Sequence, residues 1–404
     1  MKRPINRSLI LVCGVLVLLC MGLIYAWSIF VGPLEAEFGW TRAQTSLTFS
    51  ISMMGFSLGG LSAGYLQKST SPRFVVALGS TLILVGFLVC SRMQALWQLF
   101  VFYGVLGGVG VGLCYNVWLG TTLANFTDRT GFASGWLLMG FGLGGLILGK
   151  IVSALMYSDI GWRTTFVIIG IAVFLVGILT LPLLRLPEIS ATAAAQTANT
   201  GDMPPSRMLR TGVFWLYLFW CWILLGLGLA VVGQAALFAT DTGASPSFAA
   251  TAVGLLSLGN GGARVVLGAI FDKHGRKTAA FVATLLTAAG VVLLTVAYQM
   301  SVLPLVIVAL FLCGFGYGAI SAVNPASTRT IFGGTYFQQN FGVIFVLSSP
   351  AIFIGNSVSS MVKTATGSYM PFLLAATAVA IVGFVLQGLV ETCMKKSMKK
   401  ENAA

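Results

Sequence analysis

The sequence predicts an all-α membrane protein with twelve transmembrane helices in two pseudo-symmetric six-helix halves. Of its 404 residues, 57% are hydrophobic and only 8% are charged, and the mean hydropathy is +0.94. A soluble domain usually has about 25% charged residues, so this composition excludes an ordinary soluble surface. The net charge of +13 does not indicate a nucleic-acid partner, because its distribution among the loops explains it better.

Twelve apolar runs are long enough to cross a bilayer, which takes about 20 helical residues. In chain order they cover 9–31, 44–66, 74–92, 95–120, 132–157, 163–184, 211–238, 249–271, 278–298, 302–323, 337–361 and 370–390. The first run follows a basic flank, as in a signal peptide. It lacks an obvious small-residue cleavage site, so we expect a retained first helix.

The longest polar stretch lies between the sixth and seventh runs. It is rich in Ala and Thr, contains a Pro-Pro pair and shows no hydrophobic pattern, which is typical of a linker. We therefore expect an N-terminal half at 1–184, a cytoplasmic linker at 185–210, and a C-terminal half with a basic tail at 211–404.

The basic residues predict the topology. With the N-terminus inside, 17 of the 23 Lys and Arg fall in inner segments and 4 in outer ones, while Lys150 and Arg264 lie within spans. Cytoplasmic loops carry this excess, so both termini are expected in the cytoplasm and the protein in the plasma (inner) membrane.

A loop motif occurs once in each half. It follows the eighth span as Gly268-x-x-x-Asp272-Lys273-x-Gly275-Arg276-Lys277 and the second span as Gly64-x-x-x-Lys68-x-x-x-Pro72-Arg73. The offset of 268 − 64 = 204 residues is what duplicated six-helix halves would leave. The first copy has Lys68 where the second has Asp272.

This motif, the twelve spans and the central linker resemble the major facilitator superfamily over the whole chain. Short blocks are similar to the branch of oxalate/formate antiporters and monocarboxylate transporters. They are Tyr25-Ala-Trp-Ser-Ile-Phe30, Pro33-Leu34, Phe38-Gly39-Trp40, Asn260-Gly261-x-x-Arg264 and Asn340-Phe341-Gly342. The resemblance implies an alternating-access transporter in which the cation at Arg264 is associated with the substrate carboxylate.

Arg264 is the leading candidate for a binding residue. A mid-membrane arginine costs about 2.5 to 3.5 kcal/mol on insertion scales, so it is expected to face protein or an aqueous cavity. No Asp or Glu lies inside any predicted span, which favours an anion from solution as its partner. Its planar fork of donors suits a carboxylate. The alternative is a structural cation bound to carbonyls of neighbouring helices.

The number of cations in the site decides between substrate classes. The oxalate/formate antiporter pattern has a lysine early in span eleven, where this chain has Ser348, which favours a monocarboxylate over a dianion. Lys150 in span five is a possible second cation, and a dicarboxylate becomes plausible if it faces the cavity. Its alternative is an ammonium that reaches the outer interface.

Other polar residues within the spans outline a small pocket. Their hydroxyl and amide groups can orient a carboxylate, or can instead form interhelical hydrogen bonds and packing contacts. They are Tyr25, Tyr115, Asn116, Gln234, Asn260 and Tyr317.

Charged residues of the inner loops are candidates for gating. They either form a network that holds one conformation or set the topology, and exposed pairs are each worth only about 0 to 1 kcal/mol. They are Asp272, Lys273, Arg276, Asp128, Arg129 and Arg329.

The predicted function is secondary transport of small organic monocarboxylate anions, by a functional monomer in the lipid bilayer. A proton-coupled symporter is an alternative, although the only histidine, His274, lies in a loop. A ligand-binding membrane sensor is the non-transport alternative. No metal, cofactor or catalytic residue is expected, because the spans hold no HExxH, triad or carboxylate pair and the seven cysteines stand singly.

Overall fold

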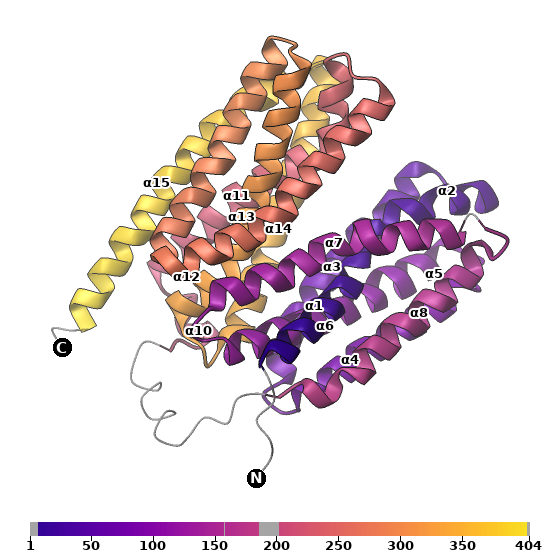
Figure 1. The fold of residues 1–404 in the computed structure, drawn as a ribbon, viewed down its shortest axis with the longest axis horizontal. Helices are drawn as coiled ribbons and strands as arrows, with labels where there is room; N and C mark the ends of the chain where they lie inside the picture. The colour runs from indigo at the N-terminus through magenta and orange to yellow at the C-terminus, as the bar shows by residue number, and fades with distance from the viewer. Residues whose placement is uncertain (1–6, 157, 186–201, 402–404) are drawn as a thin grey trace. The chain divides into compact units, whose positions relative to one another are not determined.

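The computed structural model describes residues 7–156, 158–185 and 202–401, and within these ranges the regular structure is helical (Figure 1). The predicted all-α fold class is therefore confirmed. Most of the predicted linker lies outside the described residues, so the proposed boundaries of the two halves stay a prediction.

The N-terminal part of the chain contains eleven helical segments within the described ranges. They are α1 (Arg7–Met21), η1 (Gly22–Ala26), α2 (Trp27–Phe38), α3 (Arg42–Leu66), α4 (Pro72–Cys90), α5 (Leu96–Gln98), η2 (Leu99–Gly107), α6 (Gly108–Asn125), α7 (Thr130–Met156), α8 (Gly161–Leu179) and η3 (Leu181–Leu183). Of these, η1 and η3 are 3₁₀-helices and η2 is a π-helix.

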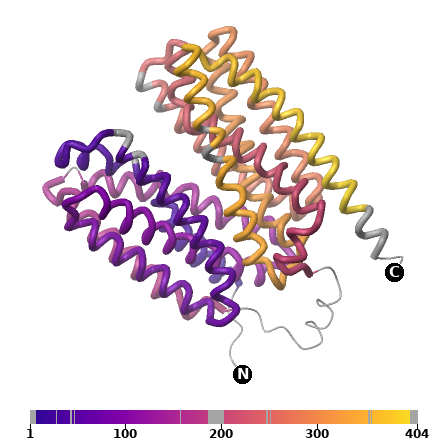
Figure 2. The backbone as a smooth tube through the Cα atoms, turned by 180° about the vertical axis from the view of Figure 1, so that it is seen from behind, coloured from indigo at the N-terminus to yellow at the C-terminus, as the bar shows by residue number. Residues whose placement is uncertain are grey.

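The C-terminal part of the chain continues with longer helices, which Figure 2 traces from magenta to yellow. They are α10 (Pro205–Met208), α11 (Gly212–Asp241), α12 (Pro246–Gln299), α13 (Leu303–Phe332), α14 (Phe337–Thr366) and α15 (Met370–Glu401). Gly275 has φ 80° inside α12, so this segment is two helices joined by a short break.

Local sequence explains where several helices begin. The hydroxyl of Thr41 caps α3 in a capping box with Gln44, and Ser71 caps α4, where Pro72 occupies the first position. A hydroxyl at the N-cap accepts a hydrogen bond from an otherwise unpaired N–H, and proline there has no N–H to lose. Ser245 and Pro246 start α12 in the same way.

Within the described residues, each predicted span lies mostly in helical structure, although the first and fourth spans each cover three consecutive helical segments. Ten helical segments of the described chain are long and apolar enough to cross a membrane, and one of them, Thr251–Gln299, contains most of the eighth predicted span and all of the ninth. The eleventh predicted span lies in α14, which is not among these ten.

The chain forms two compact units. One contains residues 1–128, 136–205 and 332–346, and the other contains 129–135, 206–331 and 347–404. The start of α7 therefore packs in the second unit and the first part of α14 packs in the first unit. These two helices run from one unit into the other.

Close helix packing in the first unit depends on glycine. A Cβ at Gly112 of α6 would lie 2.1 Å from the carbonyl oxygen of Phe56 of α3, and one at Gly59 would lie 2.2 Å from that of Val109. Any larger residue would force the two helices apart, so these glycines fix the contact between α3 and α6.

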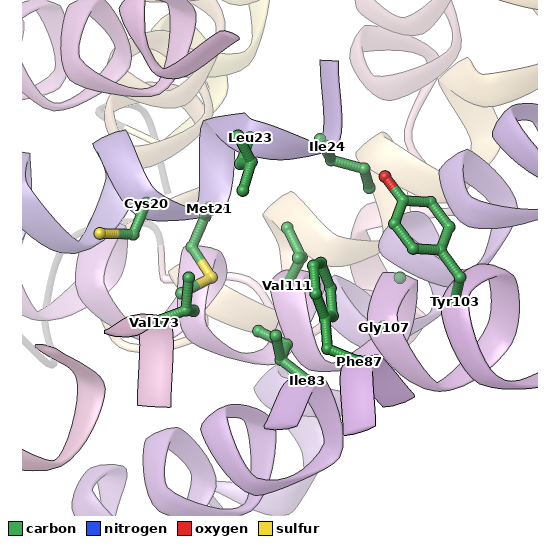
Figure 3. A pocket seen from close by; sticks show the side chains of 11 residues that line it. Cys20, Met21, Leu23, Ile24, Ile83, Phe87, Tyr103, Gly107, Val111 and Val173 are labelled. Carbon is green, nitrogen blue, oxygen red and sulfur yellow. The ribbon is translucent and has the colours of Figure 1, made fainter. Parts of the chain in front are cut away.

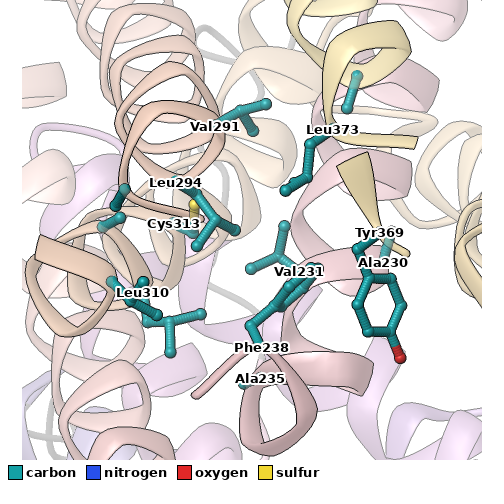
Figure 4. Close-up of a cluster of buried hydrophobic side chains, with 14 of the residues drawn as sticks. Ala230, Val231, Ala235, Phe238, Val291, Leu294, Leu310, Cys313, Tyr369 and Leu373 are labelled. Atoms are coloured by element: carbon teal, nitrogen blue, oxygen red, sulfur yellow. The ribbon is translucent and has the colours of Figure 1, made fainter. Parts of the chain in front are cut away.

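The core of the second unit is an apolar cluster built from α11, α12, α13 and α15 (Figure 4). Val231 and Phe238 of α11, Leu294 of α12, Leu310 of α13 and Leu373 of α15 are each at most 1% exposed. Dispersion contacts among such side chains hold helices together in a membrane, where apolar surface alone gives little driving force.

Candidate functional site

Arg264 is buried in the middle of the first part of α12. Arg264 is 3% exposed, and its Nε donates a hydrogen bond of 3.3 Å to Oδ1 of Asn260, one helical turn earlier. A neutral amide orients the guanidinium without cancelling its charge. The neighbouring backbone is tightly packed, since a Cβ at Gly135 of α7 would lie 2.4 Å from the Arg264 carbonyl oxygen. The sequence-predicted pair of Arg264 and Asn260 is thus in contact.

Ser348 lies in α14, in the same unit as Arg264. It is 1% exposed, and its Oγ has no hydrogen-bond partner within the described chain. Pro350 lies inside this helix, where proline removes a backbone donor. The indole of Trp222 in α11 donates to the Leu347 carbonyl at 2.7 Å. This contact ties α11 to α14 beside the buried hydroxyl.

Tyr317 and Gln234 are also buried in the second unit, each 8% exposed. The Tyr317 ring packs over Gly228 of α11, where a Cβ would lie 2.7 Å from it. The Gln234 side chain accepts a hydrogen bond of 3.0 Å from the Tyr369 hydroxyl. Both residues have structural contacts, and their predicted roles in substrate binding stay predictions.

Tyr115 is the centre of an aromatic cluster in the first unit. Its ring centroid lies 5.2 Å from that of Phe56, 5.0 Å from Phe141 and 6.1 Å from Phe345. The Tyr25 ring meets Phe141 edge-on at 5.3 Å, and Tyr25 is 37% exposed. Such edge-to-face and offset pairs make a rigid apolar wall. The sequence pointed to the two tyrosines but not to the phenylalanines around them.

Asn116 joins three helices of the first unit. It is 1% exposed, and its Nδ2 donates to the Gly60 carbonyl of α3 at 2.6 Å and to the Gln338 carbonyl of α14 at 3.1 Å. These contacts favour the interhelical alternative for this residue. Its Oδ1 is buried without a hydrogen-bond partner in the described chain, so one acceptor is left over.

Lys150 is exposed on α7. The neighbours that share its face are apolar and exposed as well: Leu146, Ile147 and Ile151 are 45%, 44% and 54% exposed. An ammonium at the end of a long apolar stem is compatible with such surroundings when it can reach a polar interface. The structure does not place Lys150 in a polar cluster.

Asp272, a predicted gating residue, binds the start of α7. Its two carboxylate oxygens accept hydrogen bonds from the N–H groups of Gly131 at 2.7 Å and Phe132 at 2.6 Å. The helices touch here, because a Cβ at Gly268 would lie 2.2 Å from the Gly131 carbonyl oxygen. A carboxylate at a helix N-terminus meets unpaired donors and the positive end of the helix dipole.

The remaining loop charges have other partners. Asp128 binds Arg7 at 2.9 Å, and this pair is about half exposed. Arg276 binds Glu391 of α15 at 2.7 Å, with both side chains close to 90% buried. Arg129 and Lys273 are exposed, and Arg329 lies in the last turn of α13. The gating roles of these residues stay predictions.

A buried polar cluster in the second unit was not predicted from the sequence. The Tyr217 hydroxyl donates to Oδ1 of Asn324 at 2.7 Å, and the Thr328 hydroxyl lies 3.3 Å from the same oxygen. The only sequence signal is an Asn-Pro pair directly after the tenth apolar run. Its three members lie on α11 and α13, and they fix the contact of these helices.

An apolar pocket lies in the first unit, and none of the predicted site residues lines it (Figure 3). Met21, Ile83, Phe87, Tyr103 and Val173 are among its lining residues, which come from α1, η1, α4, η2, α6 and α8. It offers no charged group to an ionic ligand. Among the described residues there is also no group of three or more His, Cys, Asp or Glu placed to hold a metal ion.

These features define a class of protein: a multi-pass helical membrane protein that carries a buried cation and buried polar groups in its spans. The chain belongs to the Major Facilitator Superfamily, whose family model matches residues 10–239 and 224–401. The predicted family is therefore confirmed, and the protein is a membrane transporter.

Characterised relatives match over most of the chain. The oxalate:formate antiporter of Oxalobacter formigenes is 27% identical over 402 residues, covering 98% of this chain and 94% of the relative. Monocarboxylate transporter 12 of Rattus norvegicus is 25% identical over 410 residues, covering 92% and 82%. These are the two groups that the short sequence blocks resemble.

Solved structures share the fold. The proton:xylose symporter XylE bound to 6-bromo-6-deoxy-D-glucose superposes with a TM-score of 0.73 at 16% identity, and the match covers 96% of each chain. At this identity the similarity concerns the fold alone.

Proposed function

We propose that the protein is a secondary transporter of small organic monocarboxylate anions, and that Arg264 binds the substrate carboxylate. Alternating access moves the substrate, with both termini in the cytoplasm and the protein in the plasma (inner) membrane. The proposal fits relatives that are an oxalate:formate antiporter and a monocarboxylate transporter. These relatives are transporters, which also supports the absence of an enzymatic role.

The observation that carries the proposal is the environment of Arg264. Its guanidinium is buried on a membrane-spanning helix and is oriented by the neutral Asn260. A buried cation is costly, and an anion that approaches it in a low-dielectric surrounding gains a strong charge-assisted hydrogen bond. A carboxylate substrate supplies that anion, and no Asp or Glu of the predicted spans competes for it.

A monocarboxylate is favoured over a dicarboxylate by Ser348. Its hydroxyl is buried and free to donate, but it carries no charge. A dianion would bring a second negative charge to a place without a second fixed cation. The alternative of a dicarboxylate exchanger depends on Lys150, whose exposed surroundings on α7 are apolar.

Uptake into proteoliposomes tests the assignment of Arg264. Wild-type protein is expected to take up [¹⁴C]formate, with unlabelled formate, acetate and lactate competing better than oxalate. Arg264→Ala should abolish uptake, and Arg264→Lys should lose most of it, because an ammonium keeps the charge but loses the two-pronged geometry.

Arg92→Lys is the matched control for this test, because Arg92 is exposed and lies at an outer loop. It should transport formate as the wild type does. Normal uptake by Arg264→Ala would refute the binding role, and stronger competition by oxalate than by lactate would favour the dicarboxylate alternative.

A further inference from the structure

Two residues at the end of the linker are bound to the turn that precedes α14. We call residues 333–336 the α14 turn. Asp202 accepts hydrogen bonds from the N–H of Gly334 at 3.0 Å and the N–H of Thr335 at 3.3 Å, and also from the Thr335 hydroxyl. Met203 donates its N–H to the Phe332 carbonyl at 3.0 Å. The α14 turn is thus bound by the Asp202 carboxylate, and the residue before it is bound by the Met203 backbone.

A side chain of α14 completes the attachment. Nδ2 of Asn340 donates to the Met203 carbonyl at 2.8 Å. Asn340 itself is fully buried in the first unit. The end of the linker is therefore fixed both to the turn and to the first helical turn of α14.

Gly333 shapes the turn for the carboxylate. Its φ is 88°, which is a left-handed conformation that glycine adopts without strain. A Cβ at this position would lie 1.7 Å from Oδ1 of Asp202. Asp202 therefore occupies the space that any other residue at position 333 would need.

The same kind of contact occurs in the second repeat, where a residue of the loop motif supplies the carboxylate. There Gly268 packs on the start of α7, and four residues later Asp272 accepts two backbone N–H groups from that helix. In the first repeat, Gly64 packs on the start of α14, with a Cβ position 2.7 Å from the Gln338 carbonyl oxygen. The residue four positions later is Lys68.

The contacts of Lys68 are with its own helix and not with the start of α14. It is exposed, and its Nζ lies 5.1 Å from the ring centroid of Tyr65, on its own helix. A cation would also be unfavourable next to the unpaired N–H groups at the start of a helix, where the dipole is positive. The first repeat thus has the glycine contact of the motif without its carboxylate.

We propose that Asp202 is a positioning residue for transport, which supplies from the linker the carboxylate that Lys68 has displaced from the loop. By holding the α14 turn, Asp202 fixes the start of the helix that carries Ser348 and Pro350 farther along. The first part of α14 belongs to the first unit and the rest to the second, so this helix runs from one unit into the other. This inference rests on the proposed function for its effect on transport.

Amide hydrogen exchange of purified protein tests the contact without any substrate. Asp202→Ala, and Asp202→Asn as the milder variant, should increase exchange in peptides covering 333–340 by about tenfold, because three charge-assisted hydrogen bonds are lost or weakened, two of them from backbone N–H groups. Peptides at the start of α7, which Asp272 holds, should be unchanged. Asp159→Ala is the matched control, since Asp159 is exposed in an outer loop, and it should behave as wild type throughout. Unchanged exchange at 333–340 in Asp202→Ala would overturn the proposal.

A rescue experiment separates a positioning role from a merely local one. In the Asp202→Ala background, Lys68→Asp restores the carboxylate at the repeat-related position and should return exchange at 337–340 to the wild-type rate. In proteoliposomes with [¹⁴C]formate, Asp202→Ala should change the maximal uptake rate at least threefold while KM stays within twofold, and Lys68→Asp should restore it. If Lys68→Asp rescues neither exchange nor uptake, the proposal that Asp202 takes the place of a carboxylate at position 68 is wrong. If wild-type protein takes up no formate, the proposed function fails, while the exchange result still decides the role of Asp202.

Discussion

Arg264 and Asn260 are one helical turn apart on α12, and the residue at position 260 determines whether the guanidinium has a neutral or an anionic neighbour on its own helix. The 3.3 Å contact orients the guanidinium. An amide leaves the positive charge available, whereas a carboxylate in the same place would form an internal ion pair. The prediction of an anion site therefore depends on the neutral residue at position 260 as well as on Arg264.

Replacing Asn260 by aspartate is expected to neutralise the positive charge of Arg264 by an internal ion pair, and so to weaken binding of an anion. An aspartate at this position would pair with the Arg264 guanidinium, stay ionised at neutral pH and compete with the substrate carboxylate. Asn260→Asp should reduce formate uptake at pH 7 by at least about 30-fold, the equivalent of about 2 kcal/mol. Lowering the pH from 7 to 5 should not restore uptake, because a carboxylate paired with a guanidinium stays ionised over that range.

Asn260→Ala provides the control for this prediction, because it removes the orienting contact without adding a charge. It should raise KM only severalfold and show the pH dependence of the wild type. Equal uptake by Asn260→Asp and wild type at pH 7 would mean that the charge on Arg264 is not what the substrate needs.

At the scale of elements, a carboxylate at or near the C-terminal end of the first span of each repeat contacts other helices of its own unit. In the first unit, Glu37 of α2 accepts from the indole of Trp162 at 2.6 Å and forms an ion pair with Arg163 of α8. In the second unit, Asp241 of α11 accepts from the Tyr298 hydroxyl at 2.9 Å and pairs with Lys363. The offset of 241 − 37 = 204 residues equals that of the loop motif.

The cluster around Glu37 predicts a pH dependence of stability. The hydrogen bond from Trp162, together with Arg163, holds the Glu37 pKa below its ordinary value. A lowered pKa means stability that is present above the unfolded value of about 4.3 and is lost as the pH falls through the folded pKa. Wild-type protein should therefore lose more thermal stability between pH 6 and pH 3 than Glu37→Gln, as measured by the melting temperature in detergent.

The effect of Glu37 should be small, because both Glu37 and Arg163 are more than 40% exposed. Asp159→Asn, which changes an exposed outer carboxylate, should keep the wild-type pH dependence. A Glu37→Gln curve that coincides with the wild type would show that the ion pair contributes nothing to stability.

The helices themselves followed from the sequence, because a run of apolar residues of membrane length has few other possible structures. Details set by distant partners did not follow. The π-helix Leu99–Gly107 lies inside one of the predicted spans, and no local pattern separates it from an α-helix. Asp202 fell in a stretch expected to be a simple linker, and its role depends on a turn 132 residues away.

The candidate site shows the same limit. Composition and span position were enough to select Arg264 and Asn260, which the structure places in contact. They were not enough to show that Asn116 would bridge three helices or that Asp128 would bind Arg7. Partner choice in a helical bundle is set by which faces meet, and a single sequence does not give that information.

At the scale of the whole molecule, the two units are linked through α7 and α14, each of which belongs partly to both. Carboxylates hold the beginnings of both helices: Asp272 at α7 and Asp202 at the turn before α14. Each of these contacts lies within one unit. Hydrogen bonds to a charged group contribute about 1.5 to 3 kcal/mol each, so each carboxylate stabilises the helix start that it binds.

This arrangement, without Asp or Glu in any predicted span, predicts anion exchange as the mode of coupling. Proteoliposomes preloaded with unlabelled formate should accumulate [¹⁴C]formate at least fivefold faster than empty ones, because in an exchanger the substrate-loaded transporter returns more readily than the empty one. A protonophore should leave this counterflow unchanged, since the spans offer no carboxylate to carry a proton. Uptake that needs an inward proton gradient would instead establish symport, and saturable formate binding without counterflow would establish a sensor. If the rate of formate exchange depends on the formate concentration on the opposite side of the membrane, and not on a proton gradient, both the symporter and the sensor are excluded.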